Sequence, residues 1–241
     1  MSTTTLHYIH DPLCGWCYGA APLVAAAREL VAVQAHGGGM MAGPNRQPVT
    51  PQLRAYVVEH DRRIAQLSGQ PFGDAYTNGL LHDTSAVLDS EPPIAAVLAA
   101  DDVGARGLDM LARLQVAHYV EGRRIADRAV PIALATELGL DRAAFEQALD
   151  RVSGEATQRH MAESRALLAR LGGRGFPTFA LERDGRMDLI DIGQYLARPQ
   201  EWQAWLKTQV PVTAASGAAT DFGCSPDGCV IPTPISTDQT T

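Results

Sequence analysis

The segment that decides the fold is Thr5–Gly19, with the sequence TLHYIHDPLCGWCYG. Its first six residues have the composition of a β-strand and alternate between two faces, and an Asp-Pro pair ends that strand. Cys14 and Cys17 follow at once, separated by Gly15 and Trp16. A CxxC sequence in this place, between a strand and an expected helix, is typical of a redox-active dithiol.

The residues after this segment predict a helix and a second short strand. Residues 22–35 are rich in Ala, Leu and Val, which favours a helix. The glycine run Gly37–Gly39 ends it, and Met40–Ala42 is a short apolar run that we expect to form a buried strand. The N-terminal part of the chain therefore predicts a strand, the CxxC, a helix and a strand, in that order.

From about residue 46 to residue 171 the pattern is helical. Apolar side chains recur at helical spacing from Leu53 to Leu67. Ser90, which precedes a glutamate and two prolines, has the composition of a helix start, and Asp141 is expected to cap the helix that follows it. We expect five or six helices in this block.

Strand composition returns at Pro177–Leu181. The Asp184-Gly185 pair is a strong hairpin signal, so Met187–Ile190 is predicted to be the returning strand. Residues 199–208 then have the pattern of an amphipathic helix whose apolar face carries two tryptophans.

These elements predict an α/β protein with a thioredoxin-like fold, in which a central mixed β-sheet is flanked by helices and an all-helical domain is inserted. A flexible C-terminal tail rich in Ala, Ser, Gly and Thr is expected to follow. The expected boundaries are residues 1–45 and 172–210 for the discontinuous thioredoxin-like domain, 46–171 for the helical insertion and 211–241 for the tail.

Composition excludes several classes of protein. The chain of 241 residues carries a formal net charge of -7, which argues against a nucleic-acid-binding surface. It contains no run of about 18 apolar residues, so we expect no transmembrane helix and no membrane partner. The first ten residues contain no Lys or Arg, which argues against a secretory signal. We therefore expect a cytoplasmic protein, in which paired thiols are usually catalytic or metal-binding.

Cys14 and Cys17 have the spacing that thiol–disulfide exchange requires. A helix that begins at the CxxC stabilises a thiolate on Cys14 through its free N–H groups and its dipole. Cys14 is thus expected to be the exposed nucleophile, and Cys17 the buried resolving thiol that releases the product from a mixed disulfide. The alternative is half of a zinc site. Structural zinc needs four ligands, and only a distant CxxxxC could complete them, so we expect no metal.

The second element of the predicted site is the segment Gly175–Phe179, GFPTF. A cis Phe176–Pro177 bond would bring the Phe176 backbone beside Cys14, where an extended substrate peptide could pair with it. An ordinary trans proline that opens an edge strand is the alternative. The expected substrate contacts, shared between this segment and the CxxC, are Gly15, Trp16, Phe176 and Thr178.

Four stretches of the chain resemble the DsbA family of thioredoxin-fold disulfide oxidoreductases, in particular its FrnE-like branch. The stretches, within a likeness that covers about residues 5–210, are Asp11–Gly19, Gly38–Gly43, Asp89–Pro93 and Gly175–Phe179. The resemblance implies that Cys14 and Cys17 are catalytic and that Pro177 is cis. It also implies that the partners are protein or peptide thiols and disulfides, with a further partner that recycles the dithiol. Because Gly-Trp stands where the strongly oxidising members have Pro-His, we expect a more reducing potential.

Two other activities are open on this fold. It also carries glutathione-dependent isomerases and kappa-class glutathione transferases, so such an enzyme, with glutathione as co-substrate, is the first alternative. Those proteins have a serine where Cys14 stands and lack a CxxC, whereas this chain has both thiols. A chaperone-like peptide-binding protein that uses the helical insertion is the second alternative. We expect no cofactor beyond the dithiol itself.

Cys224 and Cys229 form a second pair near the C-terminus. They flank Ser-Pro-Asp-Gly, whose composition favours a tight turn that brings two sulfurs together. Residues 211–223 would span roughly 40 Å when extended, far enough for the pair to approach Cys14. A short flexible tether also gives an effective concentration of order millimolar. We expect this pair to exchange electrons with the CxxC; a spacer disulfide or idle thiols are the alternative.

Asp11 precedes the first cysteine by three residues. It could relay a proton to Cys17, but beside a proline it is expected to cap the turn. His7 and His10 lie on the strand that leads to the CxxC, and we expect both to pack within that strand.

Overall fold

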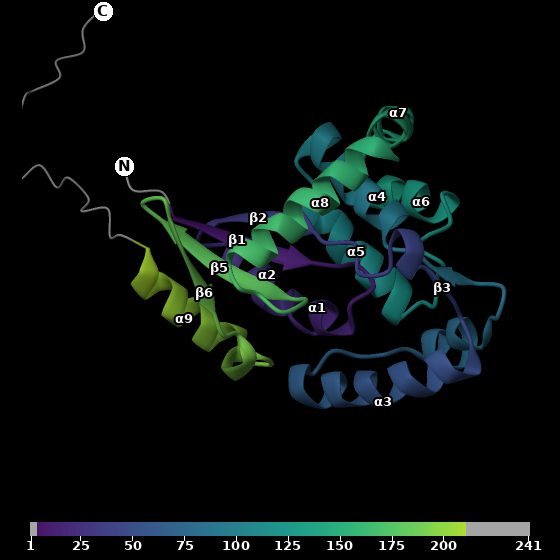
Figure 1. Ribbon diagram of the computed structural model, residues 1–241, viewed down its shortest axis with the longest axis horizontal. Helices are drawn as coiled ribbons and strands as arrows, with labels where there is room; N and C mark the ends of the chain where they lie inside the picture. The colour runs from purple at the N-terminus through teal and green to yellow at the C-terminus, as the bar shows by residue number, and fades with distance from the viewer. Residues whose placement is uncertain (1–3, 211–241) are drawn as a thin grey trace, which may run out of the picture. The chain divides into compact units, whose positions relative to one another are not determined.

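The computed structural model of the protein describes residues 4–210, and a four-stranded mixed sheet lies at its centre. The strands are β1 (Thr4–His10), β2 (Ala32–Gly37), β5 (Thr178–Arg183) and β6 (Arg186–Ile190). Their order is β2-β1-β5-β6, with β1 parallel to β2 and antiparallel to β5, and with β5 and β6 antiparallel. Helices flank this sheet (Figure 1), so the predicted α/β thioredoxin-like fold is confirmed.

The register of the sheet explains how two distant parts of the sequence meet. Ile9, near the end of β1, pairs with Thr178, the first residue of β5. Since the two strands are antiparallel, the CxxC that follows β1 and Pro177 that precedes β5 lie at the same end of the sheet. At the predicted hairpin turn, Asp184 and Gly185 both have positive φ angles, of 51° and 76°. A turn with positive φ at both central residues has a twist that matches the right-handed twist of the flanking strands.

Helices lie on both sides of the sheet and around one end of it (Figure 1). The α-helices of the described residues are α1 (Gly15–Gly19), α2 (Ala21–Arg28), α3 (Pro51–Ser68), α4 (Glu91–Gly104), α5 (Gly107–Tyr119), α6 (Ala129–Glu137), α7 (Arg142–Val152), α8 (Glu155–Arg170) and α9 (Pro199–Gln209). Helices α4–α7 gather at one end of the view in Figure 1, and α3 runs along the lower side. α3 also contacts α1, the helix that carries the CxxC.

Shorter elements connect these helices. They are the strands β3 (Gln47–Pro48) and β4 (Val87–Leu88), the 3-10 turns η1 (Gly43–Asn45), η3 (Leu80–His82) and η4 (Gly193–Tyr195), and the π-helical turn η2 (Ala75–Gly79). β3 and β4 pair with each other as a small antiparallel ladder outside the main sheet. Two-residue strands carry no periodicity, so the sequence pattern does not reveal them.

The predicted helix over residues 22–35 is wrong in its second half. α2 ends at Arg28, and the chain then enters β2, which pairs with β1 over residues 32–37. This stretch mixes alanines, which suit a helix, with valines, which suit a strand, so pairing with β1 decides its structure. The strand predicted at Met40–Ala42 is also wrong, because these residues form a loop whose amides bond to side chains.

The helical block has the predicted character. Within the described residues, α3 to α8 lie between β2 and β5 along the chain. Asp141 caps α7 as expected, since its carboxylate accepts a hydrogen bond from the Ala144 amide at 2.8 Å. The described residues pack as one compact unit, and a single large cluster of buried side chains includes residues of both the sheet and the helices. The domain boundaries expected from the sequence stay a prediction.

Two further sequence predictions concern the C-terminal tail and the absence of a transmembrane helix. Cys224 and Cys229, with the rest of the expected tail over residues 211–241, lie outside the described residues. None of the helices in the described part of the chain combines the length and the apolar character that crossing a membrane requires.

Candidate active site

Cys14 and Cys17 lie at the first turn of α1. Cys14 occupies the N-cap position, where its sulfur accepts a hydrogen bond from the Cys17 amide at 3.4 Å. Both are free thiols and both are buried, Cys14 at 5% exposed and Cys17 at 0%. The expectation of an exposed Cys14 is therefore wrong, because the loop that carries Phe176 covers its sulfur. Free N–H groups at the start of a helix stabilise a thiolate, so Cys14 is placed to act as the nucleophile.

Cys17 lies behind Cys14 as a protonated thiol. Burial, followed by its contact with Cys14, raises the pKa of Cys17 well above the ordinary value. The hydroxyl of Tyr8 donates to the Cys17 carbonyl at 3.2 Å and ties this turn to β1. A thiol without access to solvent can react only with a disulfide formed at Cys14, which suits a resolving cysteine.

The loop before β5 faces Cys14. The Cys14 thiol donates to the Phe176 carbonyl at 3.4 Å, and the Phe176–Pro177 peptide bond is cis. The hydroxyl of Thr178 donates to the Gly175 carbonyl at 2.7 Å, so this side chain is engaged within the loop. The structure therefore brings Cys14, Phe176 and Pro177 together, and their roles toward a substrate stay predictions.

Gly15 and Trp16, the two residues between the cysteines, are both half-buried. Trp16 packs against the main buried cluster. Gly15 packs against α3, where a Cβ atom would lie 2.8 Å from the Ile64 side chain and 2.9 Å from the Asp61 carboxylate. A side chain at position 15 would therefore displace the side chains of Ile64 and Asp61.

Asp11 joins three segments next to the dithiol. Its Oδ1 accepts hydrogen bonds from the Leu13 amide at 2.8 Å and the Ser90 hydroxyl at 2.9 Å, and its Oδ2 accepts one from the Met40 amide at 2.5 Å. The bond from Leu13 is the turn cap expected from the sequence. Ser90 stands at the N-cap position of α4 but makes no capping bond there, because its hydroxyl oxygen accepts from the Met41 amide at 3.0 Å while its proton is donated to Asp11. Burial raises the pKa of Asp11 to about 6.

Arg165 on α8 fixes the loop that follows β2. Its guanidinium donates to the Gly38 carbonyl at 2.7 Å and also to the Gly39 carbonyl. The Phe176 ring lies directly on Gly38, where a Cβ atom would come within 2.2 Å of two ring carbons. The glycine run thus supports the residue whose carbonyl meets Cys14. Sequence reasoning missed this role, since nothing in the sequence marks Arg165 as a partner of the run.

We expect Gly38→Ala to slow disulfide exchange at Cys14 by about tenfold. The added methyl group overlaps the Phe176 ring, so the ring must move and the carbonyl that accepts from Cys14 moves with it. The rate of reaction with a small disulfide measures the effect, with circular dichroism as the check on folding. Gly79→Ala is the control, because a Cβ atom there would meet nothing within 4 Å. An unchanged rate in Gly38→Ala would contradict the link between ring and carbonyl.

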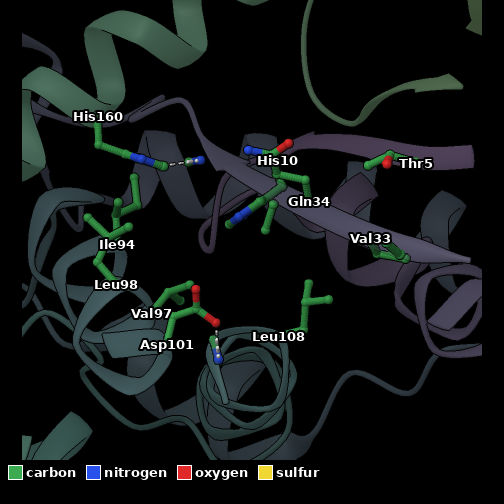
Figure 2. A pocket seen from close by; sticks show the side chains of 14 residues that line it. Thr5, His10, Val33, Gln34, Ile94, Val97, Leu98, Asp101, Leu108 and His160 are labelled. Carbon is green, nitrogen blue, oxygen red and sulfur yellow. Dashed lines mark hydrogen bonds between the residues drawn. The ribbon is translucent and has the colours of Figure 1, made fainter. Parts of the chain in front are cut away.

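A cavity of about 480 Å³ runs along β2, and its lining includes neither cysteine of the CxxC (Figure 2). His10 and His160 are among the residues that line it. Burial lowers the pKa of His10 to about 3, so its ring is neutral at physiological pH. His7 instead bonds to His36 at 3.0 Å and to Glu182 at 2.8 Å. Both histidines of β1 are buried in the fold.

The surroundings of Cys14 suit the exchange of a thiol with a disulfide. The thioredoxin fold is one that commonly carries this chemistry. The chain is therefore a thiol–disulfide oxidoreductase of the thioredoxin fold. A family model described as the DSBA-like thioredoxin domain matches residues 5–194, and the chain belongs to that family. The resemblance to the DsbA family is confirmed, while the FrnE-like branch stays a prediction.

Solved structures include similar proteins. The cytosolic disulfide reductase DsbM from Pseudomonas aeruginosa is 60% identical, with a TM-score of 0.81 over 85% of this chain and 98% of that chain. The structure of that reductase with GSH gives 57% identity and a TM-score of 0.79 over the same shares. A putative protein disulfide isomerase from Nitrosomonas europaea, 24% identical, shares the fold with a TM-score of 0.70 over 86% of this chain and 100% of its own. Among curated protein sequences, none matches this chain significantly.

Proposed function

We propose that the protein is a cytoplasmic, glutathione-linked reductase of protein or peptide disulfides. The observation that carries the proposal is the Cys14 thiol at the start of α1, with the Phe176 carbonyl 3.4 Å away and Cys17 buried behind it. Similarity at 60% identity to a protein described as a cytosolic disulfide reductase supports the direction and the compartment. The structure of that protein with GSH supports glutathione as the reductant.

The proposed reaction uses both thiols in turn. The Cys14 thiolate attacks one sulfur of the substrate disulfide and forms a mixed disulfide, while the other substrate sulfur leaves as a thiolate and takes up a proton. Cys17 then loses its proton and attacks the Cys14 sulfur, which releases the second substrate thiol and leaves a Cys14–Cys17 disulfide. Two glutathione molecules reduce this disulfide and become glutathione disulfide. Two electrons thus pass from glutathione to the substrate, with no cofactor beyond the dithiol.

Substrate contacts follow from the surroundings of Cys14. An extended substrate peptide would pair with the Phe176 backbone, which already accepts a hydrogen bond from the Cys14 thiol in this structure. Trp16, half-buried beside the nucleophile, offers an apolar surface to the same peptide. Gly15 contributes backbone alone, and Thr178 acts by holding the loop through Gly175.

The experiment that tests this proposal traps the first intermediate. In Cys17→Ala with Cys224 and Cys229 also changed to serine, no second cysteine can displace glutathione from Cys14, so incubation with glutathione disulfide is expected to leave one glutathionyl group on Cys14. Intact-protein mass spectrometry measures its yield, and peptide mapping locates it. Wild-type protein, in which Cys17 is 0% exposed behind Cys14, is expected to release that group and form its internal disulfide. A triple variant that stays unmodified while an added model thiol is glutathionylated would overturn the proposal.

Cys17→Ala with Cys224 and Cys229 retained tests the proposed exchange between the dithiol and that pair. The support for that exchange is the sequence, in which Ser-Pro-Asp-Gly separates the two cysteines. If the pair serves the CxxC, mild oxidation of Cys17→Ala without glutathione yields a disulfide between Cys14 and Cys224 or Cys229. If no such linked peptide forms, the pair has no part in the cycle.

A further inference from the structure

Asp61 is a buried carboxylate that reaches the first turn of α1 from α3. It is 6% exposed, and its Oδ1 lies 2.9 Å from the position that a Cβ atom of Gly15 would occupy, one residue after the nucleophile. Its Oδ2 accepts a hydrogen bond from the Tyr76 hydroxyl at 2.9 Å. Within residues 4–210 no arginine or lysine pairs with it, so a neutral phenol is the group that holds this carboxylate.

A chain of contacting aromatic rings runs from Tyr76, which bonds to Asp61, to Tyr18 on the helix that begins at the CxxC. Tyr119 on α5 is buried, and its ring stacks on Tyr18 of α1 with centroids 4.8 Å apart. It also meets the Tyr76 ring edge-on at 5.3 Å. Burial raises the pKa of Tyr119 above its ordinary value, and the nearby charges that raise it further include Asp61, Cys14 and Cys17. The carboxylate and the two sulfurs therefore share one buried region, in which charges interact more strongly than in water.

We propose that Asp61 is a positioning residue that acts through Cys14. Its ionised carboxylate opposes formation of the Cys14 thiolate and so keeps the redox potential of the dithiol on the reducing side. Two negative charges that share a region of low dielectric destabilise each other. A strong oxidant of this fold owes its potential to a stabilised reduced form. Asp61 has the opposite effect, because it destabilises the thiolate of the reduced form. The repulsion between the carboxylate and the thiolate is the same whether the protein reduces or oxidises its substrate.

The titration of Asp61 sets the pH at which this effect appears. Burial raises the pKa of Asp61 to about 6, against smaller opposing effects of the Tyr76 hydrogen bond and of His60. The groups that face the carboxylate are thus His60 along α3, Tyr76 from η2, Tyr119 from α5 and the CxxC turn of α1. The carboxyl is neutral at pH 5 and ionised at pH 7.5, so repulsion of the thiolate is absent at the lower pH and present at the higher one.

The test compares the full-length wild-type protein with Asp61→Asn, both fully reduced. Each is alkylated with iodoacetamide between pH 5 and pH 8, and mass spectrometry of peptides gives the rate at Cys14 alone. Asparagine keeps the size of the side chain and an acceptor for Tyr76 but carries no charge. We expect Asp61→Asn to react about fivefold faster than wild type at pH 7.5 and at the same rate at pH 5. Its redox equilibrium with glutathione is expected to shift toward the reduced protein.

Glu59→Gln is the matched control, since it removes the same charge from an exposed position on the same helix. It is expected to leave the rate at Cys14 unchanged at every pH. A ratio of Asp61→Asn to wild type that does not depend on pH, or a variant that behaves like Glu59→Gln, would overturn the inference.

Tyr76→Phe provides a second test that does not require Asp61→Asn to fold. The hydrogen bond from Tyr76 lowers the pKa of Asp61, so its loss is expected to raise that pKa. The carboxylate then begins to slow the alkylation of Cys14 at a higher pH than in the wild-type protein. A Tyr76→Phe profile that coincides with the wild-type profile counts against Asp61 as the source of the effect.

Discussion

Replacement of Cys14 by serine is expected to abolish disulfide reduction, with a loss of turnover of at least about 1,000-fold. Serine has nearly the size of cysteine, so the contacts at the start of α1 remain. Its hydroxyl is not ionised at neutral pH and forms no bond to sulfur that could carry the electrons. Consumption of glutathione in the presence of a disulfide substrate, followed through glutathione reductase, measures the turnover.

Cys17→Ser is the informative partner of this variant. It keeps the nucleophile, so the first step proceeds and a mixed disulfide accumulates on Cys14. The two variants should therefore differ in kind: Cys14→Ser forms no mixed disulfide, whereas Cys17→Ser forms the mixed disulfide on Cys14 but no internal disulfide, and its turnover depends on attack by glutathione on that mixed disulfide. Because Cys14 is 5% exposed and Cys17 is fully buried, alkylation of the native protein should also modify Cys14 before Cys17. Retention of a tenth or more of wild-type turnover in Cys14→Ser would refute the assigned role.

The sequence predicts those parts of the molecule that depend on local chemistry. Cys14 and Cys17 follow a strand and begin a helix, and their spacing alone places both on its first turn. An Asp-Gly pair specifies the hairpin turn of β5 and β6, because few other residues adopt the two positive φ angles found there. The segment around Pro177 is placed beside Cys14 by the sheet, which the strand pattern already implies once β1 and β5 are taken as neighbours.

Other parts depend on contacts between distant segments and leave no local mark. β2 is a strand only because β1 is there to pair with it, and its mixture of Ala and Val also fits a helix. Ser90 has the composition of an N-cap, yet its hydroxyl bonds to Asp11, which lies 79 residues away along the chain. Asp61 is one charged residue among several on α3, and only the packing of α3 against Gly15 separates it from its exposed neighbours.

In α9, the sequence pattern predicts the helix and its apolar face but not how deeply each side chain is buried. The sequence predicts an amphipathic helix that buries two tryptophans, and α9 has this form, but the two side chains differ. Trp202 is 0% exposed and donates from its ring nitrogen to the Leu23 carbonyl of α2 at 2.9 Å, whereas Trp205 is half-buried. Trp202 also meets the Phe179 ring of β5 edge-on at 6.3 Å. The Trp202 side chain thus connects α9 to both α2 and the sheet.

Trp202→Ala is therefore expected to lower the free energy of unfolding by about 3–5 kcal/mol, through lost burial and the cavity left behind. This is a large share of the roughly 5–15 kcal/mol that holds an ordinary domain together. Urea unfolding followed by circular dichroism at 222 nm, a common wavelength for helix content, measures the change. Trp205→Ala removes the same side chain from the same helix and is expected to cost about 1–2 kcal/mol, in proportion to its smaller burial. Equal losses in the two variants would mean that α9 is held by its apolar face as a whole and not by the contact of Trp202 with Leu23 and Phe179.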